Sequence, residues 1–409
     1  MLVAGLGAFL LLTATAALSD TLSTAIEQAV EKNLIDLETE AGFLGIPGAP
    51  SVNYIIGFLW AIWVGWIFST VGAFGGIMAG VGHITIFGLG DYAKSFGKDM
   101  AINKLITDSI RVSNQWLVGL SALISSANYY RMGRLVVPLG ICLAIGGVGG
   151  SWLIPDLTAG KISLKAYIGY FGLIVFLLGI MLLRETTAAG QAKNKKAKEA
   201  AASFEKKTSE SDTIKKGVQI MQGSRLKMTI AFGLVVASTL WANLAGEAKW
   251  VAYILLLLGW GGGFFLGTIR FKFYGVEFHF KAYVPMLGGI FIAGIASFLG
   301  VGGGFLFVPF LTSVAGLPMF LVAGTSALVV LVGMVVSIFS YMVGKGIIIH
   351  WGLIGAELFG IFIGSIIGPR TSRYIPDIWL KRIFVVLAFY VGIRYTTKGF
   401  LGYSILPPF

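Results

Sequence analysis

The sequence predicts an all-α, polytopic membrane protein that crosses the bilayer about eight to ten times. Hydrophobic residues make up 56% of the 409 positions, charged residues only 12%, and the mean hydropathy is +0.85. An average soluble domain is about one-quarter charged. Apolar runs long enough to span a bilayer as helices recur along the chain, and several of them are interrupted by glycines.

The formal net charge is +12. Lys and Arg accumulate in the cytoplasmic loops of membrane proteins, so we attribute this charge to such loops and expect no nucleic-acid partner. The chain has a single cysteine, Cys142. One cysteine excludes an internal disulfide framework and a cysteine-based zinc cluster. We expect no metal and no other cofactor.

Residues 1–50 combine an apolar N-terminal segment with an acidic stretch. Residues 1–18 carry no charge and fit either a first span or a cleaved signal. Residues 19–50 hold six acidic side chains against Lys32 alone. Because this stretch lacks the positive charge that retains a loop in the cytoplasm, we expect it to be extracytoplasmic.

The remainder divides into two membrane regions separated by a linker and a hairpin. The basic residues of 184–228 predict a cytoplasmic linker, which we expect to be solvated. The first transmembrane repeat is expected at 51–183, a helical hairpin with its loop at 229–283, and the second repeat at 284–409. Apolar runs predict spans at about 52–74, 113–127, 135–154, 166–183, 229–245, 250–268, 284–308, 324–343, 347–368 and 383–399.

An internal repeat links the two membrane regions. Residues 69–76 align with 297–304 at an offset of 228, and residues 130–134 align with 341–345 at an offset of 211. The two offsets differ by 17 residues, which correspond to the polar stretch 91–112 that the second region lacks. The first region is entered from the acidic side and the second from the basic side, which predicts two inverted repeats that meet near the middle of the membrane.

Broken, glycine-rich helices in both repeats are the predicted binding site. The glycines concerned are Gly75 and Gly76 in the first repeat and Gly302, Gly303 and Gly304 in the second. Gly disfavours a continuous helix, and exposed backbone N–H groups at such breaks can accept an anion. Close packing of membrane helices is the alternative reason for small residues here.

Neutral polar side chains occupy equivalent positions in the two repeats. At the offset of 211, Asn114 and Gln115 align with Thr325 and Ser326. Neutral donors can bind an anion without trapping it, so we predict that all four contact substrate. Small polar residues that only pack helices together remain the alternative.

Four ionisable residues in or near spans are candidates for gating or proton relay. His83 follows the first glycine cluster, and Arg111 lies one turn before Asn114, where it faces either the site or the interface. Glu357 is a carboxylate well inside a late span, with His350 two turns before it on the same face. Carboxylates at membrane depth are functional candidates, and a hydrogen bond between helices is the structural alternative.

The glycine motifs resemble those of a known family. The motif residues are Gly300 to Pro309, then Gly324 to Ser326, and a span ending at Gly364 to Pro369. Together they are similar to the sulfite exporter TauE/SafE family of membrane permeases, over about residues 52–400 and most clearly in the second half. The first repeat departs from the pattern, with Ala73-Phe74 and Val81 where glycine and proline would be expected.

That resemblance implies transport of small anions, especially sulfite and organosulfonates, usually by export across the cell (inner or plasma) membrane. It implies a small anionic substrate and membrane lipid as partners, and it leaves a homo-oligomer open. Proton-coupled uptake of an organic anion is the alternative, with an anion channel or a membrane-embedded enzyme behind it. We expect no catalytic residues, because three histidines and one cysteine do not supply a catalytic cluster.

Overall fold

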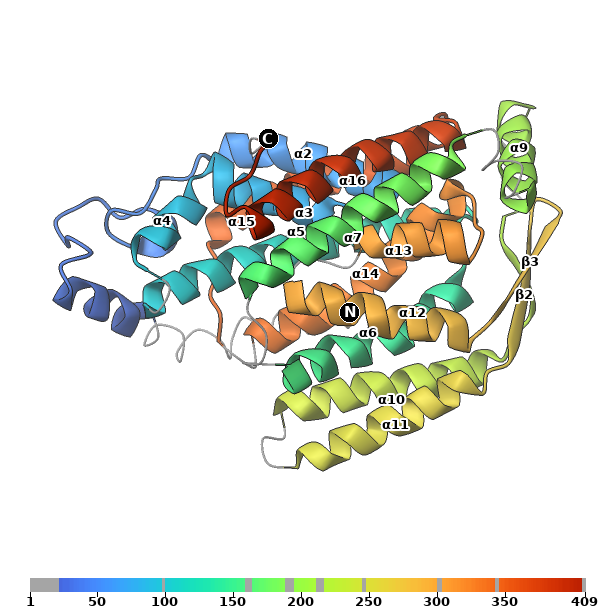
Figure 1. Ribbon diagram of the computed structural model, residues 1–409, viewed down its shortest axis with the longest axis horizontal. Helices are drawn as coiled ribbons and strands as arrows, with labels where there is room; N and C mark the ends of the chain where they lie inside the picture. The colour runs from blue at the N-terminus through green and yellow to red at the C-terminus, as the bar shows by residue number, and fades with distance from the viewer. Residues whose placement is uncertain are drawn as a thin grey trace.

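The computed structural model describes residues 22–97, 100–158, 164–187, 195–210, 217–244, 248–299, 304–342 and 346–406. These residues form an elongated helical bundle whose long helices run roughly along its longest axis (Figure 1). One end carries α4 and the segment before α2, and the opposite end carries α9 and a small sheet. We call these the α4 end and the α9 end. Residues 1–18, predicted as a span or a signal, lie outside the described residues.

The first membrane region starts at Asn53, whose side chain caps α2 by accepting from the backbone N–H groups of Ile55 and Ile56. A left-handed Gly72 ends α2, and the chain turns back through a short helix followed by a π-helical turn. The elements are α2 (Tyr54–Val71), α3 (Gly75–Val81), η2 (Gly82–Ile86), α4 (Leu89–Ser95), α5 (Ala101–Arg131), α6 (Val137–Thr158) and α7 (Leu164–Glu185).

The middle of the chain differs from the prediction in two ways. It contains a three-stranded antiparallel sheet, so the fold is mostly helical and the all-α prediction is wrong on this point. Strand β2 alternates buried Ile269, Phe271 and Phe273 with more exposed Arg270 and Lys272, which is strand periodicity within what was predicted to be a loop. The elements are α9 (Lys195–Glu210), β1 (Gln219–Gln222), α10 (Arg225–Leu244), α11 (Lys249–Phe264), β2 (Thr268–Phe273) and β3 (Val276–Lys281).

The linker is also more ordered than a solvated connection. Helix α9 buries Ala197, Ala200, Ala201 and Phe204. The Phe204 ring lies 4.4 Å from the Phe320 ring, centroid to centroid. Part of the linker therefore packs on the α9 end of the bundle.

Apart from α4, the second membrane region has the element order of the first. A helix is followed by a short helix with a π-helical turn, and then by three long helices. The elements are α12 (Tyr283–Leu299), α13 (Gly304–Pro309), η3 (Phe310–Val314), α14 (Met319–Met342), α15 (Trp351–Ser372) and α16 (Asp377–Phe400).

Glycines bring two pairs of helices into backbone contact. A Cβ added at Gly360 or Gly364 of α15 would lie 2.3 or 2.0 Å from a carbonyl oxygen of α2. One added at Gly146 or Gly150 of α6 would lie 1.9 or 2.6 Å from a carbonyl oxygen of α12. Such close approach is typical of membrane helices, which gain little from burying apolar surface against one another.

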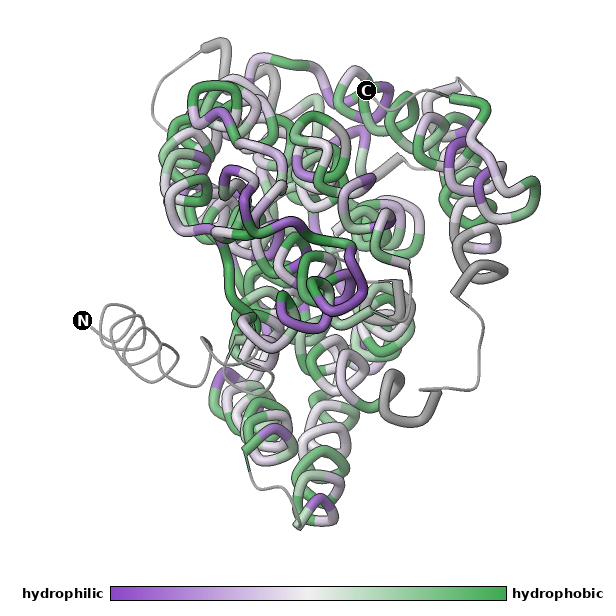
Figure 2. The backbone as a smooth tube through the Cα atoms, turned by 90° about the vertical axis from the view of Figure 1, so that its left-hand side faces the viewer, coloured by the Kyte–Doolittle hydropathy of each residue, from purple (hydrophilic) through white to green (hydrophobic). Residues whose placement is uncertain are grey.

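Four of the described helices are long and apolar enough to cross a membrane, and further apolar helices are shorter. The four are Tyr54–Val71, Arg225–Leu244, Met319–Met342 and Trp351–Ser372. Viewed from the α4 end, the helices are largely hydrophobic, while hydrophilic residues gather on the segments that face the viewer (Figure 2). Helix α5 extends beyond its predicted apolar span to Ala101, because its first turns lie against the segment before α2.

Candidate anion-binding cavity

The break between α2 and α3 is held in place by α14. Gly72 has φ of 75°, and a Cβ there would lie 2.2 Å from the Ser326 hydroxyl. That hydroxyl donates to the Gly72 carbonyl oxygen at 3.0 Å. Phe74 also adopts a left-handed conformation, with φ of 66°, which is uncommon for a bulky residue. The left-handed backbone and the close contact with α14 therefore favour glycine at position 72, and Ser326 stabilises the break through its hydrogen bond.

A cavity of about 510 Å³ lies between the two membrane regions. Its lining comes from α3 and η2, α5 and α6 on one side and from α12, α13, α14 and α16 on the other, with α10 at the edge. Helix α5 contributes mostly from its first half, whereas α6, α10, α14 and α16 contribute from their second halves. Because these helices alternate in direction, the cavity lies in the half of the bundle nearer the α4 end (Figure 1).

The charged side chains that line the cavity are all basic. They are Arg111, Arg394 and Lys398, and no Asp or Glu of the described part of the chain belongs to the lining. Arg111 is partly neutralised by Asp108, whose Oδ1 accepts from its Nη1 at 3.1 Å. Cations in a concave, partly apolar site make the potential positive and favour an anion.

Neutral polar groups complete the lining. Asn114 and Gln115 of α5 both belong to it, as does Trp152 of α6. The Gln115 Oε1 and Trp152 Nε1 atoms are buried and have no hydrogen-bond partner within the described chain. A buried polar atom without a partner is costly, so these two atoms are available to a ligand or to water in the cavity.

The predicted glycines fall into three groups. Gly76 lines the cavity. Gly75 packs on Phe68, where an added Cβ would lie 2.9 Å from the ring, and Gly304 packs on Val330. Gly302 and Gly303 lie outside the described residues.

Thr325 and Ser326 do not line the cavity, although they align with Asn114 and Gln115. Both are fully buried. The Thr325 hydroxyl accepts from the Val136 backbone N–H at 3.2 Å, and Ser326 bonds to the α2–α3 break. In this structure their hydroxyls hold helices together and contact no open space.

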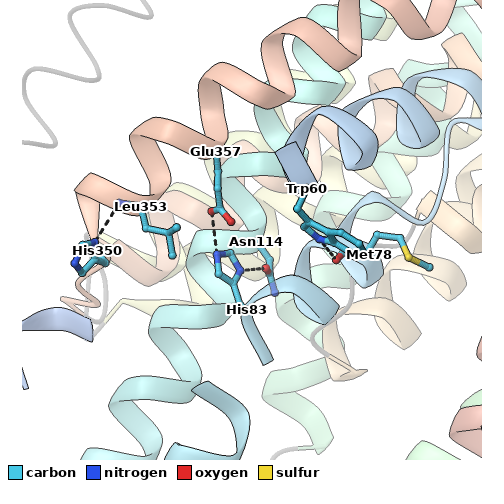
Figure 3. A network of polar contacts seen from close by, with 7 residues as sticks. All are labelled: Trp60, Met78, His83, Asn114, His350, Leu353 and Glu357. Atoms are coloured by element: carbon cyan, nitrogen blue, oxygen red, sulfur yellow. Dashed lines mark hydrogen bonds and ion pairs between the residues drawn. The ribbon is translucent and has the colours of Figure 1, made fainter. Parts of the chain in front are cut away.

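His83 and Glu357 meet beside the cavity, although 274 residues separate them. His83 Nε2 lies 3.0 Å from Glu357 Oε2, and its Nδ1 lies 2.6 Å from Asn114 Oδ1 (Figure 3). The side chains of His83 and Glu357 are each 1% exposed. Neither lines the cavity, so Asn114 is the contact between this pair and the cavity.

His350 does not pair with Glu357. Its Nδ1 accepts from the Leu353 backbone N–H at 3.1 Å and so caps α15 (Figure 3). Its ring stacks on Phe43 with 5.7 Å between the ring centroids. Seven residues of helix rise about 10 Å, which is too far for a direct contact between the two side chains. The predicted relay from His350 to Glu357 is therefore absent from this structure.

Arg394 and Lys398 were missed in the sequence. They lie near the end of the span predicted at about 383–399 and resemble the basic residues found at the ends of many membrane helices. Their spacing of four residues places them on one face of α16, but only the fold shows that this face meets the cavity.

Residues 212–395 match the family model described as Sulfite exporter TauE/SafE. No curated protein and no solved structure matches the chain. The match includes the motifs at 300–309, 324–326 and 364–369, and it ends within α16. The predicted resemblance to this family is thus confirmed over residues 212–395. This similarity covers 184 of the 409 residues, and the family to which it points consists of membrane transporters of sulfur-containing anions.

Proposed function

We propose that the protein is an alternating-access transporter of a small sulfur-containing anion, either sulfite or an organosulfonate, and that the cavity is its substrate site. The observation that carries this proposal is the charge of the lining. Arg111, Arg394 and Lys398 face a cavity without a carboxylate among its described lining residues. The buried Trp152 indole N–H beside them can donate a hydrogen bond to an oxygen of a sulfite or sulfonate group.

The order of elements supports two inverted repeats. Helices α5 and α14 end at Arg131 and Met342, which coincide at the predicted offset of 211. The π-helical turns begin at Gly82 and Phe310, which coincide at the offset of 228. The close packing of α15 on α2 also corresponds to that of α6 on α12. Transporters with such repeats commonly bind substrate where the repeats meet and expose it to each side in turn.

The distribution of charge suggests the orientation. Basic residues gather toward the α9 end, at the end of α5, the start of α10 and the strands of the sheet, as in Arg131, Arg225, Lys227, Arg270, Lys272 and Lys281. The acidic segment 22–50 lies at the α4 end. By the positive-inside rule the α9 end and linker 184–228 are cytoplasmic, and the cavity belongs to an outward-facing state in a cell membrane.

The membrane potential favours export. Each negative charge leaving an inside-negative compartment gains roughly 2.3 kcal/mol per 100 mV. An anion that is exported without a co-transported proton therefore needs no coupling ion, and its direction is then set by the potential and the substrate gradient.

Counterflow in proteoliposomes tests the proposal. Labelled sulfite should enter vesicles preloaded with unlabelled sulfite in a saturable way, and sulfonates, thiosulfate and sulfate as competitors should rank the substrates. A competing sulfonate that is itself transported, without sulfite flux, would keep the transporter and change the substrate. Flux that does not saturate would instead indicate a channel.

A matched pair of glycine substitutions localises the site. Gly333 lines the cavity and has open space around its Cβ position, whereas Gly355 has equal space but lies outside the lining. Gly333→Trp should abolish counterflow by filling the cavity, and Gly355→Trp should retain it. Equal loss in both variants, or full activity in Gly333→Trp, would contradict the proposed site.

A further inference from the structure

The pair of His83 and Glu357 is buried, ionisable and one hydrogen bond away from the cavity. We propose that this pair binds one proton, that its protonation sets the direction of the Asn114 amide, and that the cavity therefore binds its anion together with a proton. The inference rests on the proposed anion transport, and it adds a second ligand, the proton, to the same site.

The protonated pair orients Asn114 to receive an anion. With a proton on both ring nitrogens, His83 donates through Nε2–H to Glu357 and through Nδ1–H to Asn114 Oδ1, as the two distances allow. The carboxamide oxygen of Asn114 then accepts from the histidine, and the Asn114 NH₂ group can donate to another partner. A Cβ at Gly80 would lie 3.3 Å from Nδ2, and Gly80 lines the cavity. The donor side of the amide thus lies toward the cavity.

Loss of the proton from His83 Nδ1 turns the Asn114 side-chain amide around. The remaining proton stays on Nε2, where the Glu357 carboxylate accepts it, so Nδ1 becomes an acceptor. Asn114 must then turn its NH₂ group toward His83, which presents its oxygen to the cavity and repels an anion. The pair also gains a net negative charge next to the cavity. Both changes weaken anion binding, so proton and anion binding are positively coupled.

Other charged or titratable groups on the surrounding elements are accounted for. On α5, Arg111 is paired with Asp108, and on α4, Lys94 is paired with Asp91. On α15 the other titratable group near Glu357 is the capping residue His350. Helix α2 contributes the uncharged Trp60, whose indole donates to Met78 O, and Gly57, whose Cβ position is 3.2 Å from Glu357 Cγ. Tyr54 at the start of α2 contacts His350.

This coupling changes the energetics of transport. A monoanion that moves with one proton carries no net charge, so the membrane potential no longer drives it. Its direction then follows the proton and anion gradients. Whether the His83–Glu357 pair takes up a proton with the anion therefore distinguishes a proton-coupled transporter from an uncoupled exporter.

Binding of an alkyl sulfonate such as ethanesulfonate at several pH values tests the inference, because this probe keeps its charge from mildly acidic to mildly alkaline pH. Affinity should be highest at low pH and should fall by up to about tenfold per pH unit above the pKa of the pair. In weakly buffered solution in that range, binding should take up about one proton per anion.

Three variants separate coupling from structure. Glu357→Gln keeps a hydrogen bond to His83 but removes the charge, and it should abolish proton uptake and the pH dependence. Asn114→Leu leaves the buried pair intact, and it should lower affinity at acidic pH and flatten the profile. The control His279→Asn, on the exposed face of β3, should keep both properties.

Ethanesulfonate binding that is strong but independent of pH, with no proton uptake, would overturn this inference and leave anion transport standing. An unchanged pH profile in Asn114→Leu would also overturn it, and this holds even if Glu357→Gln fails to fold. If the unmodified protein binds no sulfur-containing anion at any pH, the proposed function itself fails.

Discussion

Positions that align between the sequences of the two membrane regions have different surroundings in the structure. Asn114 of α5 lines the cavity, while Thr325, its counterpart on α14, is buried against the Val136 backbone N–H. In the first region, α3 follows the break and lines the cavity. In the second region, Gly304 and the hydroxyl of Ser326 pack against the α2–α3 break instead. Under the proposal of two inverted repeats, this difference corresponds to a first repeat that is open and a second repeat that is closed.

The closed contact can be broken at Gly72. Gly72→Ala should cost about 3 kcal/mol of stability, because a left-handed alanine is strained and its Cβ would overlap Ser326 and α14. Gly88→Ala is the control, since Gly88 is also left-handed, with φ of 68°, but has nothing within 4 Å of its Cβ position. It should cost only about 1 kcal/mol. Unfolding of both variants in detergent measures the difference, and equal losses would show that the contact with α14 is unimportant.

The open cavity can be weakened through its charges. Arg394→Gln and Lys398→Gln should each lower anion affinity by roughly tenfold or more, since hydrogen bonds to charged groups contribute about 1.5–3 kcal/mol. Arg382→Gln removes the same charge from the other end of α16, where Arg382 stacks on Trp379, and should leave affinity unchanged. Titration with sulfite or ethanesulfonate distinguishes them. A similar loss in all three variants would indicate a general effect of net charge.

The smallest expected effect lies at Thr325. Thr325→Val leaves the Val136 N–H without its acceptor and should destabilise the proposed outward-facing state by about 1 kcal/mol. Anion affinity measured from the outside should fall only slightly, in contrast to Asn114→Leu. A loss in Thr325→Val as large as that in Asn114→Leu would mean that both positions contact substrate in this state.

The sequence predicted much of the fold because apolar runs report membrane helices directly. A helix occurs at each predicted span, and α2, α10, α14 and α15 meet the length and apolarity of a membrane span. The small sheet was missed because its alternation of apolar and charged residues lies in a stretch read only for its charge. The inverted relation of the two repeats and the position of the glycine clusters near the middle of the membrane remain predictions. The order of the elements supports the first of these.

The site was less accessible to sequence reasoning, because it depends on contacts between distant segments. Glu357 was selected as an ionisable residue at membrane depth, yet its partner is His83 rather than the nearby His350. Arg394 and Lys398 gave no local signal that separates them from interface residues. Arg111 lines the cavity, but its bond to Tyr341 comes from a helix 230 residues away. Local spacing identifies candidates, whereas their pairing requires the fold.

Labelling of single cysteines from each side of the membrane tests whether the two repeats open in turn. The single Cys142 is buried and can be replaced by serine to give a cysteine-free background. In that background, Ser337→Cys probes the cavity lining and Thr325→Cys probes the closed copy, and each must retain counterflow. The reagent is a thiol probe that cannot cross the membrane.

Ser337→Cys should be labelled from the extracytoplasmic side, and Thr325→Cys should not. When substrate drives turnover, Thr325→Cys should become labelled from the cytoplasmic side, because the second repeat then opens. If Thr325→Cys stays unlabelled from the cytoplasmic side while transport proceeds, or is labelled from the outside, the two repeats do not exchange roles and the account is wrong.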